Sequence, residues 1–422
     1  MTKRLRHKLR SGSRQRLRYT AAAVMITVLA SFLAACDTYD AFYREFVDKS
    51  EETYETVKIG VFEPLSGADK EFGELEKIGI ELGREVFPTC MKKEVELIYA
   101  DNKSDIYVAE EAIQDLIKKK PAVILGSYGS VYSLVAGKYI EEAQIPAIAI
   151  TNTNPLVTSN NPYYFRVCFI DSYQGVVLAK YAFESMGAVS AAVMRPRNDD
   201  LAAAMVAAFE DKFVLDTQNP SAIVKTVEYT AGDTDFSAQL TQIKQSGVTV
   251  VFLPANETDG AAIVTQAKEM GVNAVFLGTE AWDTEGFIEK VGDAAGMAVF
   301  STVYDAEASV NGTTELFLAA YREKYGEDAV PEPAVALGFD AYMVAVAALD
   351  KIGTVRDGDL LRLSLQYTFQ HPGASGNITI GAGGDPMKTV IVKGIRNGES
   401  HNIYTMEPAV VNPVLPLQEQ GA

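Results

Sequence analysis

Histidine and cysteine are scarce in this chain, which holds three of each among its 422 residues. No two of them stand at the spacings that hold a zinc ion, so we expect no bound metal. The chain also lacks a Gly-x-Ser-x-Gly nucleophile elbow, a phosphate-binding loop and a Gly-x-Gly-x-x-Gly dinucleotide motif. These absences argue against a hydrolase or a nucleotide-dependent enzyme, and we expect no enzymatic activity and no cofactor.

Basic residues are few beyond the first 36 residues. That N-terminal segment holds eight of the 38 lysines and arginines and none of the 56 acidic residues. The rest of the chain therefore carries 30 basic and 56 acidic side chains, a formal charge of −26. A surface with this excess of negative charge repels phosphate backbones, so we expect no nucleic-acid partner.

The N-terminus has the parts of a secretory signal. Basic residues precede an uncharged stretch over residues 21–35, which is short for a membrane span and ends in Leu33-Ala34-Ala35-Cys36. The pattern resembles a bacterial lipoprotein signal, which implies that Cys36 becomes the lipidated first residue of the mature protein. The alternative is an N-terminal membrane anchor with an incidental cysteine, and either arrangement faces the protein outward at the cell membrane. We predict a signal over residues 1–36 and an acidic tether over residues 37–56.

Two cysteines follow the signal, Cys90 and Cys168. Outside the cytoplasm such a pair is able to form a disulfide. The sequence does not give the separation of their Cα atoms, which decides whether a bond fits. A disulfide and two buried free thiols therefore stay equally open.

Short apolar runs alternate with amphipathic helical patterns from about residue 57 to residue 300. The runs are too short for buried helices and rich in Val, Ile and Ala, as the strands of parallel sheets are. This alternation predicts parallel sheets covered by helices, and the length of the stretch predicts two lobes. The predicted strands are 57–62, 95–100, 122–125, 147–150, 191–194, 224–229, 248–253, 274–277 and 298–302. Beyond them we predict helices over 312–325 and 333–352, followed by short strands at 377–380 and 389–395.

Polar residues follow several of the predicted strands, at the edge where open parallel sheets bind their ligands. Ser130 begins a predicted helix, whose free N–H groups attract an anion such as a carboxylate. Thr151 and Thr153 add hydroxyl groups from a neighbouring strand end, and Glu280 offers a negative charge to an ammonium group. Each residue also has a plainer interpretation. Ser130 is then a helix N-cap, the threonines are ordinary turn residues and Glu280 is a solvated acid.

A set of short segments from residue 57 to about residue 397 carries a family resemblance. The segments are Ile59-Gly60-Val61, Pro64-Leu65-Ser66-Gly67, Phe72-Gly73, Ile124-Leu125-Gly126, Ile145-Pro146-Ala147-Ile148, Leu156-Val157-Thr158, Tyr164-Phe165-Arg166, Asp171-Ser172-Tyr173-Gln174-Gly175, Phe276-Leu277-Gly278 and Phe339-Asp340-Ala341-Tyr342. In their order and spacing they resemble the periplasmic branched-chain amino-acid-binding proteins, the solute receptors of ABC importers. The resemblance implies an α/β type I periplasmic-binding fold, with two Rossmann-like lobes whose parallel central sheets are joined by a multi-strand hinge. We predict one lobe over residues 57–171 and 301–375 and the other over residues 172–300 and 376–412.

The resemblance also implies roles for the residues at the strand ends. Ser130, Thr151 and Thr153 would bind the α-carboxylate of an amino acid and help to hold its α-ammonium group. Glu280, from the second lobe, would hold the ammonium group. Phe72 would cover the ligand as an aromatic side chain, and Tyr128, in the loop before Ser130, joins the predicted ligand-binding residues.

Two positions in the predicted second lobe depart from the family pattern. Where the family often places an aromatic residue, this chain has a polar segment from Arg195 to Asp200, and a second such position falls near Asn256. We include Asp200 and Asn256 among the predicted ligand-binding residues. With Asp199 and Glu63 they suit a polar or cationic ligand side chain, which puts a branched aliphatic ligand in question. The plainer interpretation is that these side chains are solvated.

Together these features predict an extracytoplasmic, lipid-anchored protein that captures an amino acid or a similar small zwitterion and delivers it to ABC permease subunits. We expect a monomer whose lobes close around the ligand by hinge motion. A ligand-binding sensor module for a membrane receptor is an alternative, because its binding site would be the same. An extracellular hydrolase is a further alternative with less support, because no nucleophile has a recognisable base.

Overall fold

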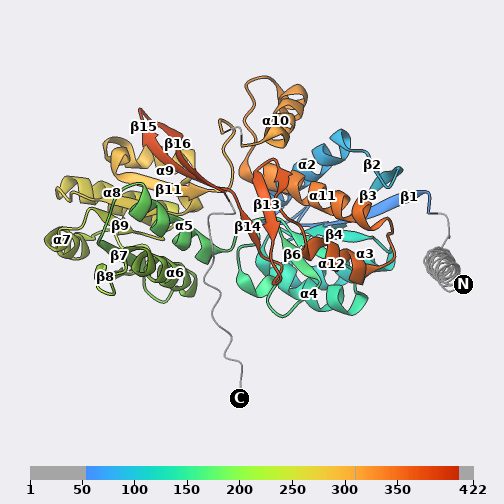
Figure 1. Cartoon of the computed structure of the whole chain (residues 1–422), viewed down its shortest axis with the longest axis horizontal. Coiled ribbons are helices and arrows are strands. Elements are labelled where there is room, and N and C mark those ends of the chain that lie inside the picture. Colours follow the sequence, from blue (N-terminus) through green and yellow to red (C-terminus); the bar gives the residue numbers. More distant parts are fainter. Residues whose placement is uncertain (1–53, 309, 408–422) are drawn as a thin grey trace, which may run out of the picture. The chain divides into compact units, whose positions relative to one another are not determined.

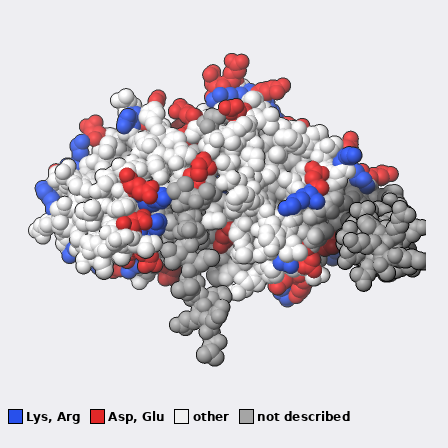
Figure 2. Space-filling view, in the orientation of Figure 1, with Lys and Arg blue, Asp and Glu red and all other residues white. Residues whose placement is uncertain are grey.

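The computed structural model of the chain describes residues 54–308 and 310–407 (Figure 1). The predicted signal over residues 1–36, its Cys36 and nearly all of the predicted tether lie outside these residues. Among the described helices, none is both long enough and apolar enough to cross a membrane. Over the described residues, Lys and Arg side chains are interspersed with Asp and Glu on the face shown in Figure 2.

The first sheet has six strands in the order β2-β3-β1-β4-β5-β6. All neighbouring strands are parallel except β2 and β3. All four residues of β4 and all three of β5 are buried, because helices cover both faces of a parallel sheet. The strands are β1 (Thr56–Glu63), β2 (Thr89–Cys90), β3 (Lys93–Asp101), β4 (Val123–Gly126), β5 (Ala147–Ala149) and β6 (Tyr164–Arg166).

Helices from both halves of the sequence pack on this sheet. Their bounds are α2 (Lys70–Val86), α3 (Ile106–Lys118), α4 (Ser130–Ala143), α10 (Gly312–Tyr325), α11 (Pro333–Ile352) and α12 (Gly358–Gln366), with the short 3₁₀ helix η3 at Pro155–Val157. Helices α3 and α4 lie side by side and bury residues such as Ile113 and Ile140 in one core with the sheet. Helix α11 packs against α2. The crossing is close: a Cβ atom at Gly338 would lie 2.2 Å from the carbonyl oxygen of Glu76.

The second sheet has seven strands in the order β16-β15-β11-β10-β9-β7-β8. The five strands from β8 to β11 pair in parallel, and β15 and β16 extend the sheet in antiparallel fashion. The strands are β7 (Ala191–Pro196), β8 (Ile223–Tyr229), β9 (Val250–Phe252), β10 (Val275–Gly278), β11 (Ala298–Thr302), β15 (Val390–Arg396) and β16 (Glu399–Met406).

A second set of helices covers this sheet. Helices α5 (Asp171–Glu184) and α6 (Asp200–Thr217) pack against each other, and Phe209 of α6 stacks on Phe252 of β9 with ring centroids 4.5 Å apart. A separate core joins Leu240, Ile263 and Phe287 from the other helices. Those helices are α7 (Ser237–Ser246), α8 (Glu257–Glu269) and α9 (Glu285–Val291), with the 3₁₀ helices η4 (Glu280–Trp282) and η5 (Gly292–Met297).

A small antiparallel sheet, β12-β13-β14, lies where the chain returns to the second sheet (Figure 1). Its strands are β12 (His371–Gly373), β13 (Gly376–Ile380) and β14 (Pro386–Lys388), and β12 contacts α10 and α11. The chain therefore passes between the two large sheets three times, after β6, after β11 and after β14. Strand pairing does not test the predicted lobe boundaries, because these concern which residues move together, so they stay predictions.

The predicted fold class is confirmed: the chain forms two α/β bodies dominated by parallel sheets. All nine predicted strands before residue 303 form strands, and the two predicted helices match α10 and α11. Five strands had no prediction, namely β2, β6, β12, β14 and β16. Four of these are two or three residues long, which is too short to show a hydrophobic period.

Candidate ligand-binding site

The first part of the candidate site lies where β1, β4 and β5 end. These strands are neighbours in the first sheet, so the loops after them meet at one edge. Phe72, near the start of α2, stacks on Tyr128 in the loop after β4, with ring centroids 4.7 Å apart and an angle of 8° between the rings. Phe72 is 45% exposed, so an aromatic face remains available at this edge.

Ser130 is the first residue of α4 rather than its N-cap. The N-cap is Gly129, with φ of +84°, and it has no side chain to bond the helix N–H groups. The helix therefore begins with N–H groups that no cap side chain satisfies, and with the partly exposed Ser130 beside them. Such an end favours an anionic guest. The plainer interpretation of Ser130 as a cap is wrong.

A glycine allows the loop before Ser130 to approach β1 closely. Gly126 ends β4 with φ of +110°, and a Cβ atom there would lie 2.1 Å from the Phe62 carbonyl oxygen. It would also lie 2.3 Å from Glu63 Oε1. Only glycine fits this position, and its compactness lets the N–H of Tyr128 donate to Glu63 Oε2 at 2.7 Å.

Thr151 and Thr153 lie in a turn after β5, and hydrogen bonds from Arg166 stabilise this turn. The fully buried Arg166 guanidinium donates to the carbonyl oxygens of Asn152 and Asn154 and pairs with Asp385 at 2.7 Å. The thiol of Cys168 also donates to the Asn152 carbonyl, at 3.1 Å. Both Cys168 and Cys90 are buried free thiols, which settles the question of a disulfide between them.

The second part of the candidate site consists of two acidic residues, Asp171 and Glu280. Asp171 begins α5 and is buried, and Glu280 follows β10. Burial raises the pKa of Asp171, while a hydrogen bond from Thr153 lowers it. Burial and the charge of Asp171 raise the pKa of Glu280 to about 7. Asp171 Oδ2 and Glu280 Oε2 are buried, and neither has a hydrogen-bond partner among the described residues.

Gln174 fixes the backbone of Glu280. Its side-chain oxygen accepts the N–H of Glu280 at 3.1 Å and the hydroxyl of Ser301 at 2.8 Å. Gln174 and Asp171 belong to the Asp-Ser-Tyr-Gln-Gly segment, which carried the family resemblance but no predicted role. Asp171 and Gln174 are one helical turn apart at the start of α5, and this spacing is the sequence signal that could have pointed to a shared site.

Asp200 and Asn256 lie at the same edge of the second sheet as Glu280, because β7, β9 and β10 are neighbours. Both are exposed helix-start residues, and Asn256 caps α8 by accepting the N–H of Asp259 at 2.8 Å. The structure does not join them to the acids around Asp171. Trp282 is fully buried and donates to the Ala255 carbonyl at 2.9 Å, so it is a packing residue.

Glu63 and Glu76 form a buried carboxyl pair beneath the first part of the site. Both side chains are fully buried, and each is within hydrogen-bonding reach of the other. Glu76 comes from the inward face of α2 and accepts the hydroxyl of Thr151. Sequence reasoning gave Glu76 no role, since an acid on an amphipathic helix normally faces water.

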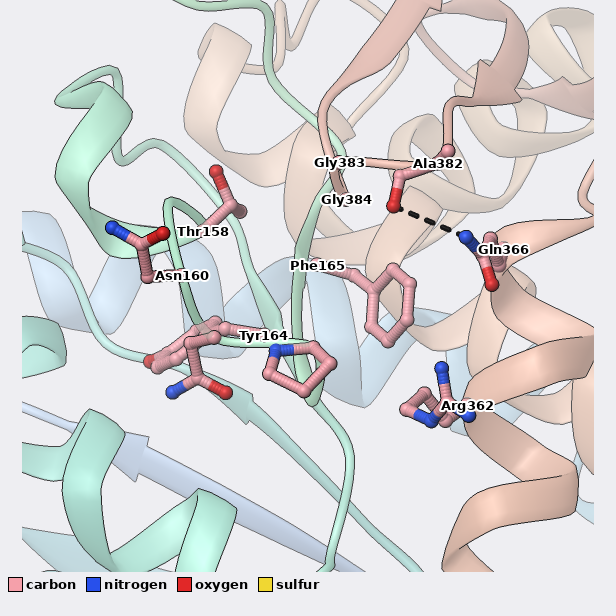
Figure 3. A pocket seen from close by; sticks show the side chains of 11 residues that line it. Thr158, Asn160, Tyr164, Phe165, Arg362, Gln366, Ala382, Gly383 and Gly384 are labelled. Atoms are coloured by element: carbon pink, nitrogen blue, oxygen red, sulfur yellow. Dashed lines mark hydrogen bonds between the residues drawn. The ribbon is translucent and has the colours of Figure 1, made fainter. Parts of the chain in front are cut away.

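A separate cavity of about 160 Å³ lies beside the loop after β6 and contains none of the predicted site residues. Figure 3 shows Arg362 and Gln366 of α12 on one side of Phe165 and Asn160 on the other. Gln366 donates to the Ala382 carbonyl at 3.1 Å. This cavity is distinct from the edge where Ser130 and Thr151 lie.

Comparison with known proteins identifies the family of the chain. The chain matches the periplasmic binding protein family over residues 56–396. It is similar to the crystal structure of a leucine-binding protein from Thermotoga maritima, with 32% identity and a TM-score of 0.68 over 84% of this chain and 100% of that chain. A Leu/Ile/Val-binding protein of Rhizobium johnstonii is 25% identical over 340 residues, 78% of this chain and 88% of that protein.

Other relatives match over a shorter region. A Leu/Ile/Val-binding protein homologue of Brucella abortus is 27% identical over 213 residues, 47% of this chain and 54% of that protein. The chain thus spans about half the length of such curated relatives. The family match nevertheless covers both large sheets except for β16. The chain belongs to the periplasmic binding protein family and is similar, within it, to branched-chain amino-acid-binding proteins.

Proposed function

We propose that the protein binds an amino acid, or a similar small zwitterion, between Ser130 and Thr151 on one side and Asp171 and Glu280 on the other. The observation that carries the proposal is the pair of buried acid oxygens without partners, Asp171 Oδ2 and Glu280 Oε2. An ammonium group has three donors and a positive charge, so it satisfies both oxygens at once. The names of the relatives, which refer to leucine, isoleucine and valine, support the same class of ligand.

The negative end of the ligand is assigned to the first sheet. The uncapped start of α4 offers N–H groups, and Ser130 offers a hydroxyl beside them. A carboxylate at this position gains from both the donors and the helix dipole. The stacked pair of Phe72 and Tyr128 supplies an apolar cover near the same end.

The ligand side chain is assigned to the region of Asp200 and Asn256. Asn256 follows β9, which is adjacent to the strand that Glu280 follows, and Asp200 follows β7, the next strand along the sheet; both residues are exposed. We therefore favour a polar or cationic amino acid over a branched aliphatic one. The preference is testable with one screen, because lysine, glutamine and leucine differ mainly at this end.

The cellular role follows from the same assignment. We propose that Cys36 is lipidated, that residues 37–56 tether the binding domain outside the cytoplasmic membrane, and that a monomer delivers the ligand to ABC permease subunits. Lobe closure around the ligand supplies the form that the permease recognises. No step in this role needs catalysis by this chain.

A thermal-shift screen of residues 54–422 against the 20 amino acids tests the proposal, because a ligand that binds only the folded state raises the melting temperature. Isothermal titration of the strongest hit then compares wild type with Ser130→Ala and Glu280→Ala. Loss of Glu280 should weaken binding by about 2–5 kcal/mol, since the ligand's ammonium group stays buried beside one acid fewer. Ser159→Ala, at an exposed position with no assigned role, is the control. Unchanged affinity in both site variants would rule out this site.

A further inference from the structure

The carboxyl pair of Glu63 and Glu76 links the loops that the proposed function assigns to the ligand's negative end. Glu63 ends β1 and accepts the N–H of Tyr128, two residues before Ser130, at 2.7 Å. Glu76 accepts the hydroxyl of Thr151 through Oε1. Each acid thus uses one oxygen to hold one ligand-binding loop. The other oxygens, Glu63 Oε1 and Glu76 Oε2, have no donor from another residue.

Among residues 54–308 and 310–407, no basic side chain forms a hydrogen bond with the free oxygens of the pair. Tyr164 of β6 and Tyr128 face it as neutral phenols, and the nearby thiol of Cys168 is also neutral. The two cations that act on Cys168 have other partners: Arg166 forms an ion pair with Asp385 at 2.7 Å, and Lys388 donates to Ser375 at 2.5 Å. Both acids are fully buried. Two adjacent buried carboxylates repel each other, so ionising both of them is strongly unfavourable in free energy.

We propose that Glu63 and Glu76 share one proton, and that this proton holds the Tyr128 loop and the Thr151 turn in the arrangement that binds ligand. The proton lies in an O–H···O⁻ bond between Glu63 Oε1 and Glu76 Oε2, which leaves each outer oxygen free to accept from its loop. Glu63 and Glu76 are positioning residues, since both lie beneath the ligand and do not touch it. The inference rests on the proposed function for its consequence in binding, but the shared proton is measurable without any ligand.

The two pairs of acids respond to pH in the same sense near neutrality. Burial, followed by the effect of Glu76, raises the pKa of Glu63 well above its ordinary value, and burial raises the pKa of Glu76 to about 7. Glu76 therefore ionises first, near pH 7, and leaves one proton shared with Glu63, which is lost only at higher pH. Glu280, with Asp171 beside it, must also ionise to bind an ammonium group. Both steps strengthen binding as pH rises through 7.

Glu76→Gln separates these effects. The amide oxygen still accepts the Thr151 hydroxyl, and the amide N–H₂ replaces the shared proton with a donor to Glu63 that no pH change removes. The variant therefore mimics the singly protonated pair at every pH. Glu71→Gln, on an exposed position of the same helix, is the matched control.

The decisive experiment is a ¹H–¹⁵N NMR titration of the ligand-free domain from pH 5.5 to 8.5. In wild type and Glu71→Gln, the amide signals of Tyr128 and Thr151 should move together with one apparent pKa near 7, and in Glu76→Gln they should not move over this range. Independent titration of the two signals, no movement in wild type, or the same movement in Glu76→Gln would overturn the inference.

Binding supplies the second readout, with the strongest amino-acid hit from the thermal-shift screen as the probe. One pH unit below the apparent pKa, wild type should bind about tenfold more weakly than Glu76→Gln, because only about a tenth of it holds the singly protonated pair. Equal affinity at that pH would overturn the positioning role. If no amino acid binds while the amide signals titrate as expected, the proposed function fails and the shared proton stands.

Discussion

Glu280 carries a charge whose presence depends on pH in the physiological range. Its carboxyl oxygen Oε2 is buried without a partner, and burial together with Asp171 raises its pKa to about 7. An acid with a raised pKa is increasingly neutral as pH falls below that value. An ammonium ligand needs the ionised form of Glu280. The affinity of the site should therefore fall as pH falls below the pKa of this side chain.

We expect the affinity of wild type for its amino acid to fall as pH decreases from 7 to 5.5, by at least about tenfold for each pH unit well below the pKa of Glu280. Isothermal titration over this range measures it. Glu280→Gln should bind weakly at every pH and lose the part of this dependence that Glu280 contributes, whereas Glu285→Gln, an exposed acid of α9, should keep it all. A wild-type affinity that does not change over this range would show that Glu280 does not hold the ligand's cation.

The same titration affects folding, with a sign that follows from the direction of the shift. Between the ordinary pKa of a glutamate and about 7, the folded protein binds more protons at Glu280 than the unfolded chain does. The free energy of unfolding therefore falls as pH rises through this window and levels off above it. Urea unfolding at pH 5 and pH 8 should show Glu280→Gln gaining stability over wild type mainly at pH 8.

The crossing of α2 and α11 places Glu76 by backbone contact. A Cβ atom at Gly338 would lie 2.2 Å from the Glu76 carbonyl oxygen, and one at Gly79 would lie 2.0 Å from the Val335 carbonyl oxygen. Both contacts are with backbone, which cannot rotate away as a flexible side chain does. The position of α2, which carries Glu76, is thus fixed by close backbone contacts at Gly79 and Gly338. The side chain of Glu76 does not fix it.

We expect Gly338→Ala to destabilise the protein by about 1–3 kcal/mol, because overpacking outweighs the ~1 kcal/mol that alanine gains over glycine inside a helix. Urea unfolding measures the change. Gly312→Ala is the control, since nothing lies within 4 Å of a Cβ atom there. A Gly338→Ala variant as stable as wild type would mean that α2 and α11 separate easily, and that the crossing does not fix Glu76.

The whole chain is organised by three passages between its two large sheets. The last of them, after β14, is anchored by Lys388, whose fully buried ammonium donates to Ser375 at 2.5 Å while Ser375 donates to Asp340 of α11. Three connections between the same two sheets permit hinge bending but oppose free rotation of one half of the chain against the other. This connectivity suits closure of two lobes on a small ligand.

We expect the amino-acid ligand to contract the protein, because both halves of the proposed site must touch it at once. Small-angle X-ray scattering with and without saturating ligand measures the radius of gyration. Glu280→Ala, tested at the same ligand concentration, should remain as extended as the ligand-free wild type. An unchanged radius on saturation of wild type would contradict hinge closure while leaving the binding assignment intact.

The apolar runs made the two parallel sheets predictable, since a strand buried on both faces must be continuously hydrophobic. The residues at the ends of β4, β5 and β10 were predictable too, because the fold class fixes where ligands bind. Glu76 and Arg166 were not. Each is a charged residue buried by contacts with segments distant in the sequence, and no local pattern distinguishes such a residue from a solvated one.

Trp282, the single tryptophan of the chain, lies two residues after Glu280 and packs on Phe287 with ring centroids 4.6 Å apart. Its indole is buried in the hydrophobic core next to the acid proposed to receive the ligand. The molecule therefore contains one tryptophan, in one half only, adjacent to the position where charge would be neutralised on ligand capture. Its emission offers an optical signal for kinetics that needs no label and no engineered reporter.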